Sequence, residues 1–311
     1  METVLITGAA GFIGFNMLKY LNSKDIDIYA MVLKDDLEGI KRIKKLSSHI
    51  KIVTETIDEL IINYKKYPQF NIIFHFATVG IQPDFNDISL ICDVNIKMGC
   101  RLIDFMKITD SNLLVNVGSC FEYGSNDGTP LTEEDVCHPE SLYAISKNSA
   151  VNLMNAYSKS VDANMITVRP FGVFGSGEGK NRLAPSIIYH GIHQIPLDLS
   201  GGEQIRDFVN VKDVVSCAYQ LSKSKKIINN EIYNICSDTP VTVKEFAMEI
   251  INYFNFDISL FHFGKLPYRK NEAMCFIGDN SKLKQTIDYQ FPKNHIKGIK
   301  DIYNEMKVLE S

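Results

Sequence analysis

The sequence predicts a doubly wound α/β fold, in which helices cover both faces of a parallel sheet, with a smaller α/β domain interleaved with it. Two observations carry this prediction. Short apolar runs alternate with helical apolar spacing up to about residue 168, and beyond Pro170 the sequence becomes irregular and glycine-rich. We therefore assign residues 1–170 and about 208–238 to a first domain, and about 171–207 and 239–311 to a second.

The first predicted unit is a strand, a tight turn and a helix within TVLITGAAGFIG, residues 3–14. Residues 4–6 are an apolar run, and residues 16–21 carry apolar side chains at helical spacing. Between them, the spacing G-x-x-G-x-x-G predicts a dinucleotide site. The first glycine permits the turn, the second lets backbone approach a pyrophosphate, and the third packs the helix on the strand. The helix N-terminus offers free N–H groups to the phosphates. The expected cofactor contacts of this loop are Gly8, Ala10, Gly11, Phe12, Ile13 and Gly14.

The remaining elements continue the alternation of strands and helices. Strands are expected at residues 28–33, 50–54, 71–76, 112–117, 165–168 and 232–235, and helices at 93–106, 142–161 and 211–222. This order favours a parallel sheet, which binds ligands at the carboxyl ends of its strands. We expect residues 241–311 to mix short helices with a small sheet.

Composition narrows the class of protein. A net charge of −4 gives no basic field, which argues against nucleic acid as a partner. The longest apolar runs fall short of a membrane span, and Met1 leads directly into the first strand, so we expect no membrane segment and no signal peptide. Seven cysteines without a C-x-x-C pair indicate reduced thiols and a cytoplasmic protein. Histidines are dispersed, so we expect no metal site.

The end of the second predicted strand bears on the choice of cofactor. Sites selective for NAD commonly place an acidic residue there, which binds the ribose hydroxyls. Val32 and Leu33 take that place here and Lys34 follows, so a 2′-phosphate would meet a cation. This favours NADP(H) over NAD(H), the alternative being that Lys34 is a solvated loop residue. Asp58, after the third strand, is expected to accept a hydrogen bond from the adenine amino group, unless it is an ordinary surface residue.

The predicted chemistry lies in three residues. Ser119 follows the fifth strand, and Tyr143 and Lys147 stand four residues apart in YAISK, on one face of the predicted helix. A phenol serves as acid or base near neutral pH when its pKa falls, and a neighbouring ammonium lowers it. The Ser119 hydroxyl is placed to polarise the reacting oxygen. An exposed helix face is the ordinary alternative for Tyr-x-x-x-Lys, but the glycine loop and Ser119 make it improbable.

Several motifs together resemble the extended short-chain dehydrogenase/reductase family, which comprises nucleotide-sugar epimerases, dehydratases and reductases. They span nearly the whole chain: TGAAGFIG, HFA, DVNIKMG, GSCFEYG, YAISK, RPFGVFG, QIRDFVNVKDV and LPYRKNEAM. The resemblance implies a Rossmann-type domain, with Ser119, Tyr143 and Lys147 at the family's catalytic positions. It also implies a nucleotide-diphosphate sugar as substrate.

The resemblance extends to further site residues. The implied cofactor contacts beyond the glycine loop are Lys34, Ile57, Asp58, Phe76, Ala77, Thr78, Asn95, Val117, Tyr143, Lys147 and Pro170. The implied substrate contacts are Thr78, Ser119, Cys120, Phe121, Asn181, Arg206, Arg269 and Glu272. Among these, Asn181 would contact the sugar nucleotide, the two arginines its diphosphate or ribose, and Glu272 the ribose hydroxyls. Guanidinium groups suit phosphate because they bind it through two parallel hydrogen bonds. The alternative for either arginine is a surface salt bridge.

Departures from the family pattern are informative. The family's 4,6-dehydratases have an Asp-Glu pair directly after the catalytic Ser or Thr, where this chain has Cys120 and Phe121, so elimination is disfavoured. The fucose-synthase type has a cysteine and a histidine at the places of Phe121 and Arg182, so epimerisation at a carbon acid is doubtful.

What remains is hydride transfer at a sugar carbon, which we expect to be C4. GSCFEYG and the end of the chain look most like 4-keto-6-deoxy-hexose reductases of deoxysugar and surface-polysaccharide biosynthesis, such as CDP-abequose and CDP-paratose synthases. We favour a reductase, or a dehydrogenase running the reaction backward. The alternatives are a 4-epimerase with tightly bound NAD and a non-catalytic nucleotide sensor. Family members commonly form homodimers through a four-helix bundle, here built from the helices at 93–106 and 142–161.

Overall fold

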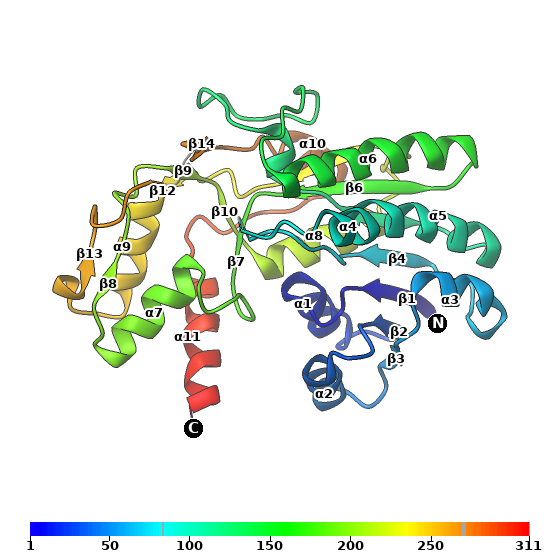
Figure 1. Cartoon of the computed structure of the whole chain (residues 1–311), viewed down its shortest axis with the longest axis horizontal. Helices are drawn as coiled ribbons and strands as arrows, with labels where there is room; N and C mark the ends of the chain where they lie inside the picture. Colours follow the sequence, from blue (N-terminus) through cyan, green and yellow to red (C-terminus); the bar gives the residue numbers. More distant parts are fainter. Residues whose placement is uncertain (83, 269–271, 311) are drawn as a thin grey trace.

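The computed structural model describes residues 1–82, 84–268 and 272–310, and its larger part is a seven-stranded parallel sheet (Figure 1). Across the sheet the strands are β11 (Ile232–Ile235), β6 (Met165–Pro170), β5 (Leu114–Val117), β4 (Ile72–His75), β1 (Glu2–Thr7), β2 (Ile26–Met31) and β3 (Lys51–Val53). Thr7, at the end of β1, pairs with Met31 on one side and His75 on the other. The order of the strands reverses at this point, which is where such sheets bind ligands.

Helices cover both faces of this sheet, as a doubly wound fold requires. One face packs against α1 (Phe12–Leu21), α2 (Leu37–Leu46), α8 (Val211–Lys223) and α10 (Ser281–Thr286), and the other against α3 (Ile57–Ile62), α5 (Met98–Thr109) and α6 (Leu142–Ser160). Alternation within β1 serves both layers, because Val4 and Ile6 face the α1 side while Leu5 faces the α5 side. The predicted α/β fold class is confirmed.

Between β4 and α6 the described part of the chain contains three short helical elements in addition to β5 and α5. These are α4 (Ile88–Ile91), a π-helical segment η2 (Cys92–Lys97) that runs directly into α5, and the 3-10 turn η3 (Cys120–Tyr123). A further turn, η1 (Tyr64–Lys66), precedes β4.

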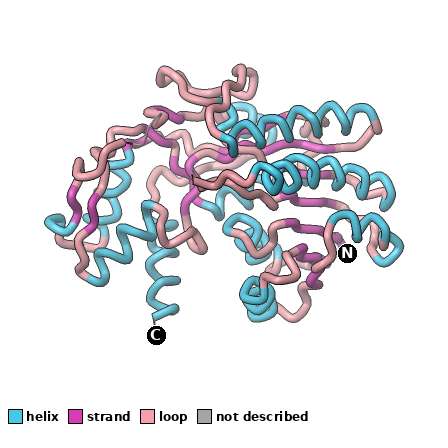
Figure 2. Tube along the Cα trace, viewed as in Figure 1, coloured by secondary structure: helices cyan, strands magenta, loops and turns pink. Residues whose placement is uncertain are grey.

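A second part of the chain has short strands of its own, drawn in magenta in Figure 2. It also has its own apolar core. Its elements are β7 (Gly172–Phe174), α7 (Leu183–His193), β8 (Leu197–Asp198), β9 (Ile205–Arg206), β10 (Phe208–Asn210), β12 (Val241–Thr242), α9 (Val243–Tyr253), η4 (Ile258–Leu260), β13 (Phe261–His262), β14 (Cys275–Phe276) and α11 (Ile296–Glu310). Phe246 and Ile250 of α9 and Ile187 of α7 are fully buried in this core. The division into two domains at the expected boundaries stays a prediction.

Element boundaries differ from expectation where strand pairing outweighs polarity. The second strand covers Ile26–Met31 rather than 28–33. Asp27 lies within this strand, and its carboxylate forms an ion pair with the Lys51 ammonium at 2.6 Å. Leu33 lies beyond the end of the strand, with 80% of its surface exposed. The expected helix at 93–106 is π-helical up to Lys97. Among the described residues, no helix is both long and apolar enough to span a bilayer.

Candidate active site

The glycine loop between β1 and α1 has the tight geometry that the spacing predicts. Gly8 adopts φ +63°, and a Cβ there would lie 2.6 Å from the backbone nitrogen of Ala77, beyond the end of β4. A Cβ on Gly14 would lie 2.2 Å from the Gly8 carbonyl oxygen, and one on Gly11 3.2 Å from the same atom. The first and third glycines are therefore fixed by packing, whereas Gly11 has more room.

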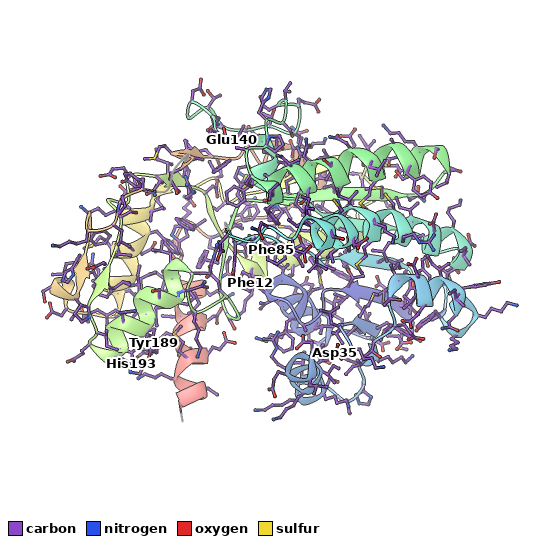
Figure 3. The ribbon with its side chains drawn as sticks, viewed as in Figure 1. Phe12, Asp35, Phe85, Glu140, Tyr189 and His193 are labelled. Carbon is purple, nitrogen blue, oxygen red and sulfur yellow. The ribbon has the colours of Figure 1, made fainter. Side chains whose placement is uncertain are left out.

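The helix that follows offers its N-terminus to an anion. The N-cap residue Gly11 makes no side-chain capping bond and the first turn of α1 holds no acidic residue, so its first N–H groups remain open to a ligand. Figure 3 labels Phe12 in this first turn, where the large sheet meets the second part. Asn16 donates to the carbonyl of Ser176 at 2.8 Å and so ties α1 to the loop after β7.

Two cations lie near the expected adenosine end. Lys34 follows β2. The pKa of Glu59 is lowered mainly by its hydrogen bonds with Thr56 and, to a smaller extent, by the charge of Lys34. Arg42 on α2 was missed by sequence reasoning; its guanidinium donates to the Ala10 carbonyl and stacks 3.9 Å from the centre of the Phe15 ring. Asp58 accepts from Arg101 at 2.8 Å. The expected bond from Asp58 to adenine stays a prediction, and this carboxylate already has a partner. Ile57 is the first residue of α3.

The carboxyl ends of three strands bring the other predicted cofactor residues together. Phe76, Ala77 and Thr78 follow β4, while Val117 and Pro170 end β5 and β6. Asn95 is buried and ties this edge to α6: its amide oxygen accepts from Thr78 Oγ1 at 3.0 Å and Val79 N at 2.9 Å, and its amide nitrogen donates to Val79 O and to Ser146 Oγ. The Asn95 side chain thus holds the loop that carries Thr78 in place through hydrogen bonds.

The three predicted catalytic side chains are buried near the carboxyl ends of these strands. Ser119, Tyr143 and Lys147 are 7%, 9% and 3% exposed. The phenol of Tyr143 lies within hydrogen-bonding reach of the Ser119 and Thr78 side chains, and the Lys147 charge acts on His75 at the end of β4. Because Gly8 abuts Ala77 and Thr78 reaches Tyr143, the phenol lies close to the glycine loop.

Electrostatics correct one expectation. Burial raises the pKa of the Tyr143 phenol and the charge of Glu122 raises it further, while the hydrogen bonds with Ser119 and Thr78 lower it. Lys147, expected to make the phenol acidic, is not among the groups with the largest effect on this pKa, in which loss of water is the largest cause. Burial also lowers the pKa of Lys147 to about 8, against an opposing effect of Glu122.

The two residues after Ser119 form an apolar surface beside the phenol. Burial raises the pKa of the Cys120 thiol to about 12, so it stays protonated at neutral pH. Phe121 is 38% exposed, and its ring meets Tyr143 edge-on at 6.5 Å and Phe276 at 5.2 Å between centroids.

Of the predicted substrate residues of the second part, Arg206 lies on β9 and contacts Glu272. Arg206 pairs with Glu272 at 3.0 Å and lies over the ring of Phe276. Asn181 is exposed in the loop before α7. Arg269 lies outside the described residues.

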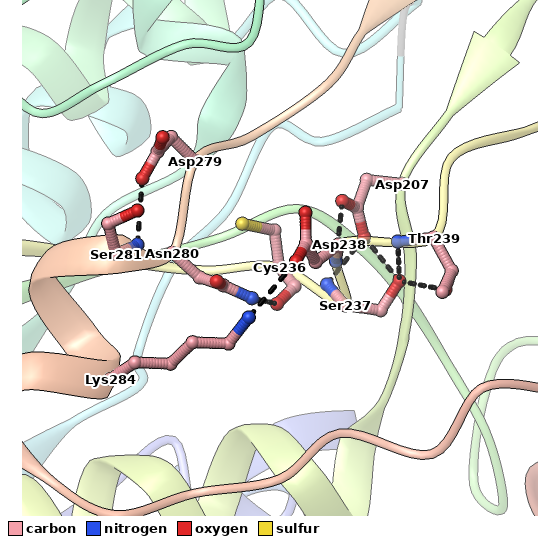
Figure 4. Close-up of polar contacts among 9 residues, drawn as sticks. All are labelled: Asp207, Cys236, Ser237, Asp238, Thr239, Asp279, Asn280, Ser281 and Lys284. Carbon is pink, nitrogen blue, oxygen red and sulfur yellow. Dashed lines mark hydrogen bonds and ion pairs between the residues drawn. The ribbon is translucent and has the colours of Figure 1, made fainter.

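A residue that sequence reasoning missed fixes the strand of Arg206. Asp207 is fully buried and accepts from the Ser237 backbone at 2.6 Å, from the Ser237 hydroxyl at 2.7 Å and from the Asp238 backbone at 3.2 Å (Figure 4). These bonds fasten the segment of Arg206 to the end of β11. The signal was present in the sequence, since Asp207 directly follows Arg206 in QIRDF, but its partners are 30 residues away.

Glu122 and Arg169 were also missed. Both are buried, at 0% and 2% exposure, and they form an ion pair directly behind Ser119. Among the described residues, no group of three or more His, Cys, Asp or Glu side chains is arranged to hold a metal ion.

Comparison with known proteins gives relatives along the whole chain. It is 25% identical to CDP-abequose synthase of Salmonella typhimurium over 315 aligned positions, covering 98% of each chain. It is 24% identical to GDP-6-deoxy-D-talose 4-dehydrogenase of Aggregatibacter actinomycetemcomitans, covering 93% of this chain and 92% of the relative.

Solved structures of similar fold include several that contain NAD. The dTDP-glucose 4,6-dehydratase of Bacillus anthracis, in complex with NAD, superposes with a TM-score of 0.86 at 23% identity, covering 100% of this chain and 98% of the other. The UDP-glucuronic acid 4-epimerase of Bacillus cereus, in complex with UDP-glucuronic acid and NAD, gives 0.87 at 21% identity, covering 99% and 100%. The sequence model of the NAD dependent epimerase/dehydratase family matches residues 4–236, more than half of the chain, and the protein therefore belongs to this family.

Proposed function

We propose that the protein is an NAD(P)-dependent oxidoreductase that transfers hydride at C4 of a nucleotide-diphosphate sugar, as a 4-keto sugar reductase or the reverse dehydrogenase. The observation that carries this proposal is that the Thr78, Ser119 and Tyr143 hydroxyls lie together beside the glycine loop. The buried Lys147 lies one helical turn from Tyr143 on α6, and its charge acts on His75 at the end of β4. The dinucleotide, held by the glycine loop, supplies or accepts the hydride.

The chain's own residues handle the proton. In the reductase direction the phenol of Tyr143 donates its proton to the oxygen of the ketone as the alcohol forms, and the raised pKa keeps the phenol protonated until then. Ser119 and Thr78 hold the same oxygen by hydrogen bonds. Lys147 has a pKa near 8 and is charged at neutral pH, so it stabilises the phenolate left behind.

The surroundings of the phenol argue for a deoxysugar. A protonated Cys120 and the ring of Phe121 offer no carboxylate to remove a proton or return water, so elimination has no base here. The Phe121 and Phe276 rings suit a methyl group next to the reacting carbon better than a hydroxymethyl group. The names of two relatives, CDP-abequose synthase and GDP-6-deoxy-D-talose 4-dehydrogenase, support the same substrate class. This fits a cytoplasmic step in surface-polysaccharide biosynthesis.

Lys34 and Arg42 support NADP(H) as the preferred cofactor. Both cations lie beside the loop region where an adenosine ribose is expected, and the tip of β2 carries Val32 and Leu33 instead of an acidic residue. Arg206 is proposed to bind the diphosphate and Glu272 the ribose, once their mutual ion pair opens.

The test is a panel of CDP-, GDP-, UDP- and dTDP-4-keto-6-deoxy sugars mixed with the enzyme and NADPH or NADH, followed by nicotinamide absorbance. The proposal expects stoichiometric oxidation of added NADPH with at least one substrate. Interconversion of 4-epimers by NAD that stays bound, with no net change of absorbance, would indicate the 4-epimerase. Binding of a nucleotide sugar with neither NADPH oxidation nor epimerisation would indicate the non-catalytic nucleotide sensor.

We also propose a homodimer through the helices η2, α5 and α6. Four apolar residues of α6, Ala144, Ala150, Val151 and Met154, are buried within the chain. Leu142, Ile145 and Leu153 remain 45–50% exposed on the same helix. Light scattering should give twice the chain mass, and Leu153→Glu should halve it. Leu266→Glu, at equal exposure in the second part, is the matched control. A monomeric wild type would refute the dimer.

A further inference from the structure

The glutamate of GSCFEYG has no assigned role in the proposed reaction, yet it is the most enclosed charge near the phenol. Glu122 is fully buried in the turn that begins at Ser119. A buried charge is costly unless it is paired and hydrogen-bonded, so its partners indicate what it is kept for.

Its two oxygens have separate partners. Oε1 accepts from the backbone N–H of Ser119 at 2.7 Å, and the Ser119 hydroxyl accepts in return from Phe121 N at 3.2 Å. Oε2 accepts from Arg169 of β6, from Nε at 2.9 Å and from Nη2 at 2.8 Å. A Cβ on Gly118 would lie 2.4 Å from Oε1, so the preceding residue leaves just enough room for the carboxylate. The turn that presents Ser119 is therefore fastened to the neighbouring strand through one side chain.

The charges around this pair come from four elements. Arg169 lies over the ring of Tyr123 at 4.5 Å, and its charge and that of Glu122 also act on Cys137. On α6, Lys147 and Tyr143 both feel the Glu122 charge. From β4, His75 faces Lys147, and burial lowers the pKa of His75 to about 3, so it stays neutral. Cys120 is protonated. Glu122 is thus the anion that acts on Lys147 from this cluster.

We propose that Glu122 is a positioning residue of the active site: it fixes the turn of Ser119 and keeps the Lys147 ammonium charged, with Arg169 as its anchor. This rests on the proposed function for its effect on turnover. The effect on Lys147 does not depend on any substrate.

The sign of the effect follows from the contacts. The Glu122 carboxylate raises the pKa of Lys147 against burial, and it raises the pKa of Tyr143. Removing the negative charge lowers both. If turnover needs a charged Lys147 and a protonated phenol, the alkaline limb of the pH–rate profile moves to lower pH.

The test is Glu122→Gln, which keeps an oxygen for Ser119 N–H but removes the charge. In protein labelled with [13Cε]-lysine, the Lys147 resonance is identified by its loss in Lys147→Arg. We expect its titration midpoint near pH 8 in the wild type and about one unit lower in Glu122→Gln. With substrate, kcat should fall about tenfold or more, with little change in KM, and the alkaline limb should move down with the Lys147 midpoint.

Glu133→Gln is the matched control. Glu133 is partly buried, and burial raises its pKa too, but it accepts from Asn234 N at 2.6 Å, away from Ser119. It should cost stability and leave the Lys147 midpoint unchanged. Glu122→Asp keeps the charge, so it should restore the midpoint even if kcat stays low, and it serves where Glu122→Gln folds poorly.

An unchanged Lys147 midpoint in Glu122→Gln, or an equal shift in Glu133→Gln, would overturn the proposal. A wild type that turns over no sugar would count against the proposed function, while the Lys147 titration would still decide the role of Glu122.

Discussion

Alanine at two glycines of the β1–α1 loop separates packing from cofactor binding. A Cβ on Gly14 meets three backbone atoms of the same loop: Gly8 O at 2.2 Å, Gly8 C at 2.9 Å and Ala9 Cα at 3.0 Å. Ordinary van der Waals contact begins at 3.4 Å, so the loop must move by about 1 Å. Overpacking of this kind costs about 1–3 kcal/mol of stability. Gly14→Ala should therefore lower the free energy of unfolding and weaken cofactor binding together.

Gly11→Ala meets only Gly8 O, at 3.2 Å, which asks for a shift of a few tenths of an ångström. Its stability should stay within about 0.5 kcal/mol of wild type. Its Cβ would nevertheless stand between the backbone and a pyrophosphate, so NADPH affinity should fall at least about tenfold, or 1.4 kcal/mol. The assays are urea unfolding and quenching of tyrosine fluorescence by NADPH. If Gly11→Ala binds NADPH as tightly as wild type, the loop does not approach the pyrophosphate and the reasoning fails.

Three further predictions follow from the site. Lys34→Ala should reduce the ratio of NADPH to NADH affinity, measured as dissociation constants by fluorescence, and an unchanged ratio would remove Lys34 from the cofactor site. The rate of hydride transfer should be independent of pH below about pH 8 and should fall at higher pH. Burial lowers the pKa of Lys147 to about 8, so Lys147 loses its charge as the pH rises. A rate that stays constant up to pH 10 would contradict this prediction. Asn95→Ala leaves the backbone N–H and C=O of Val79 without their partner and removes one of the two hydrogen bonds of the Ser146 hydroxyl, so it should cost about 1–3 kcal/mol of stability. It should also lower kcat, because Thr78 is misplaced. Urea unfolding and steady-state kinetics check the two effects, and wild-type values for both would contradict the prediction.

The sequence predicted the glycine loop and the Tyr143–Lys147 pair because the residues of each motif lie close together along the chain. Gly8, Gly11 and Gly14 lie within one turn, and Tyr143 and Lys147 lie one helical turn apart, so spacing alone shows that they act together. Apolar runs likewise predicted all seven strands of the large sheet, with boundaries off by a few residues.

The interactions that fasten the site could not be predicted in this way. Glu122 and Arg169 are 47 residues apart, and Arg42 is 32 residues from the carbonyl it contacts, so no periodicity connects them. The pKa of Tyr143 was predicted in the wrong direction, because sequence shows a neighbouring cation but not the burial that outweighs it. Interactions between residues close in sequence can be predicted from the sequence, whereas the burial of a side chain depends on how distant elements pack together.

The most direct test of the proposed chemistry is the rate of hydride transfer in a single turnover by Tyr143→Phe. This variant keeps the ring that meets Phe121 at 6.5 Å and loses only the hydroxyl. We predict NADPH affinity within about twofold of wild type and a transfer rate lower by about 10²–10⁴, the range for loss of a general acid. A rate close to wild type, with NADPH bound normally, would contradict the assignment of this phenol as the proton donor.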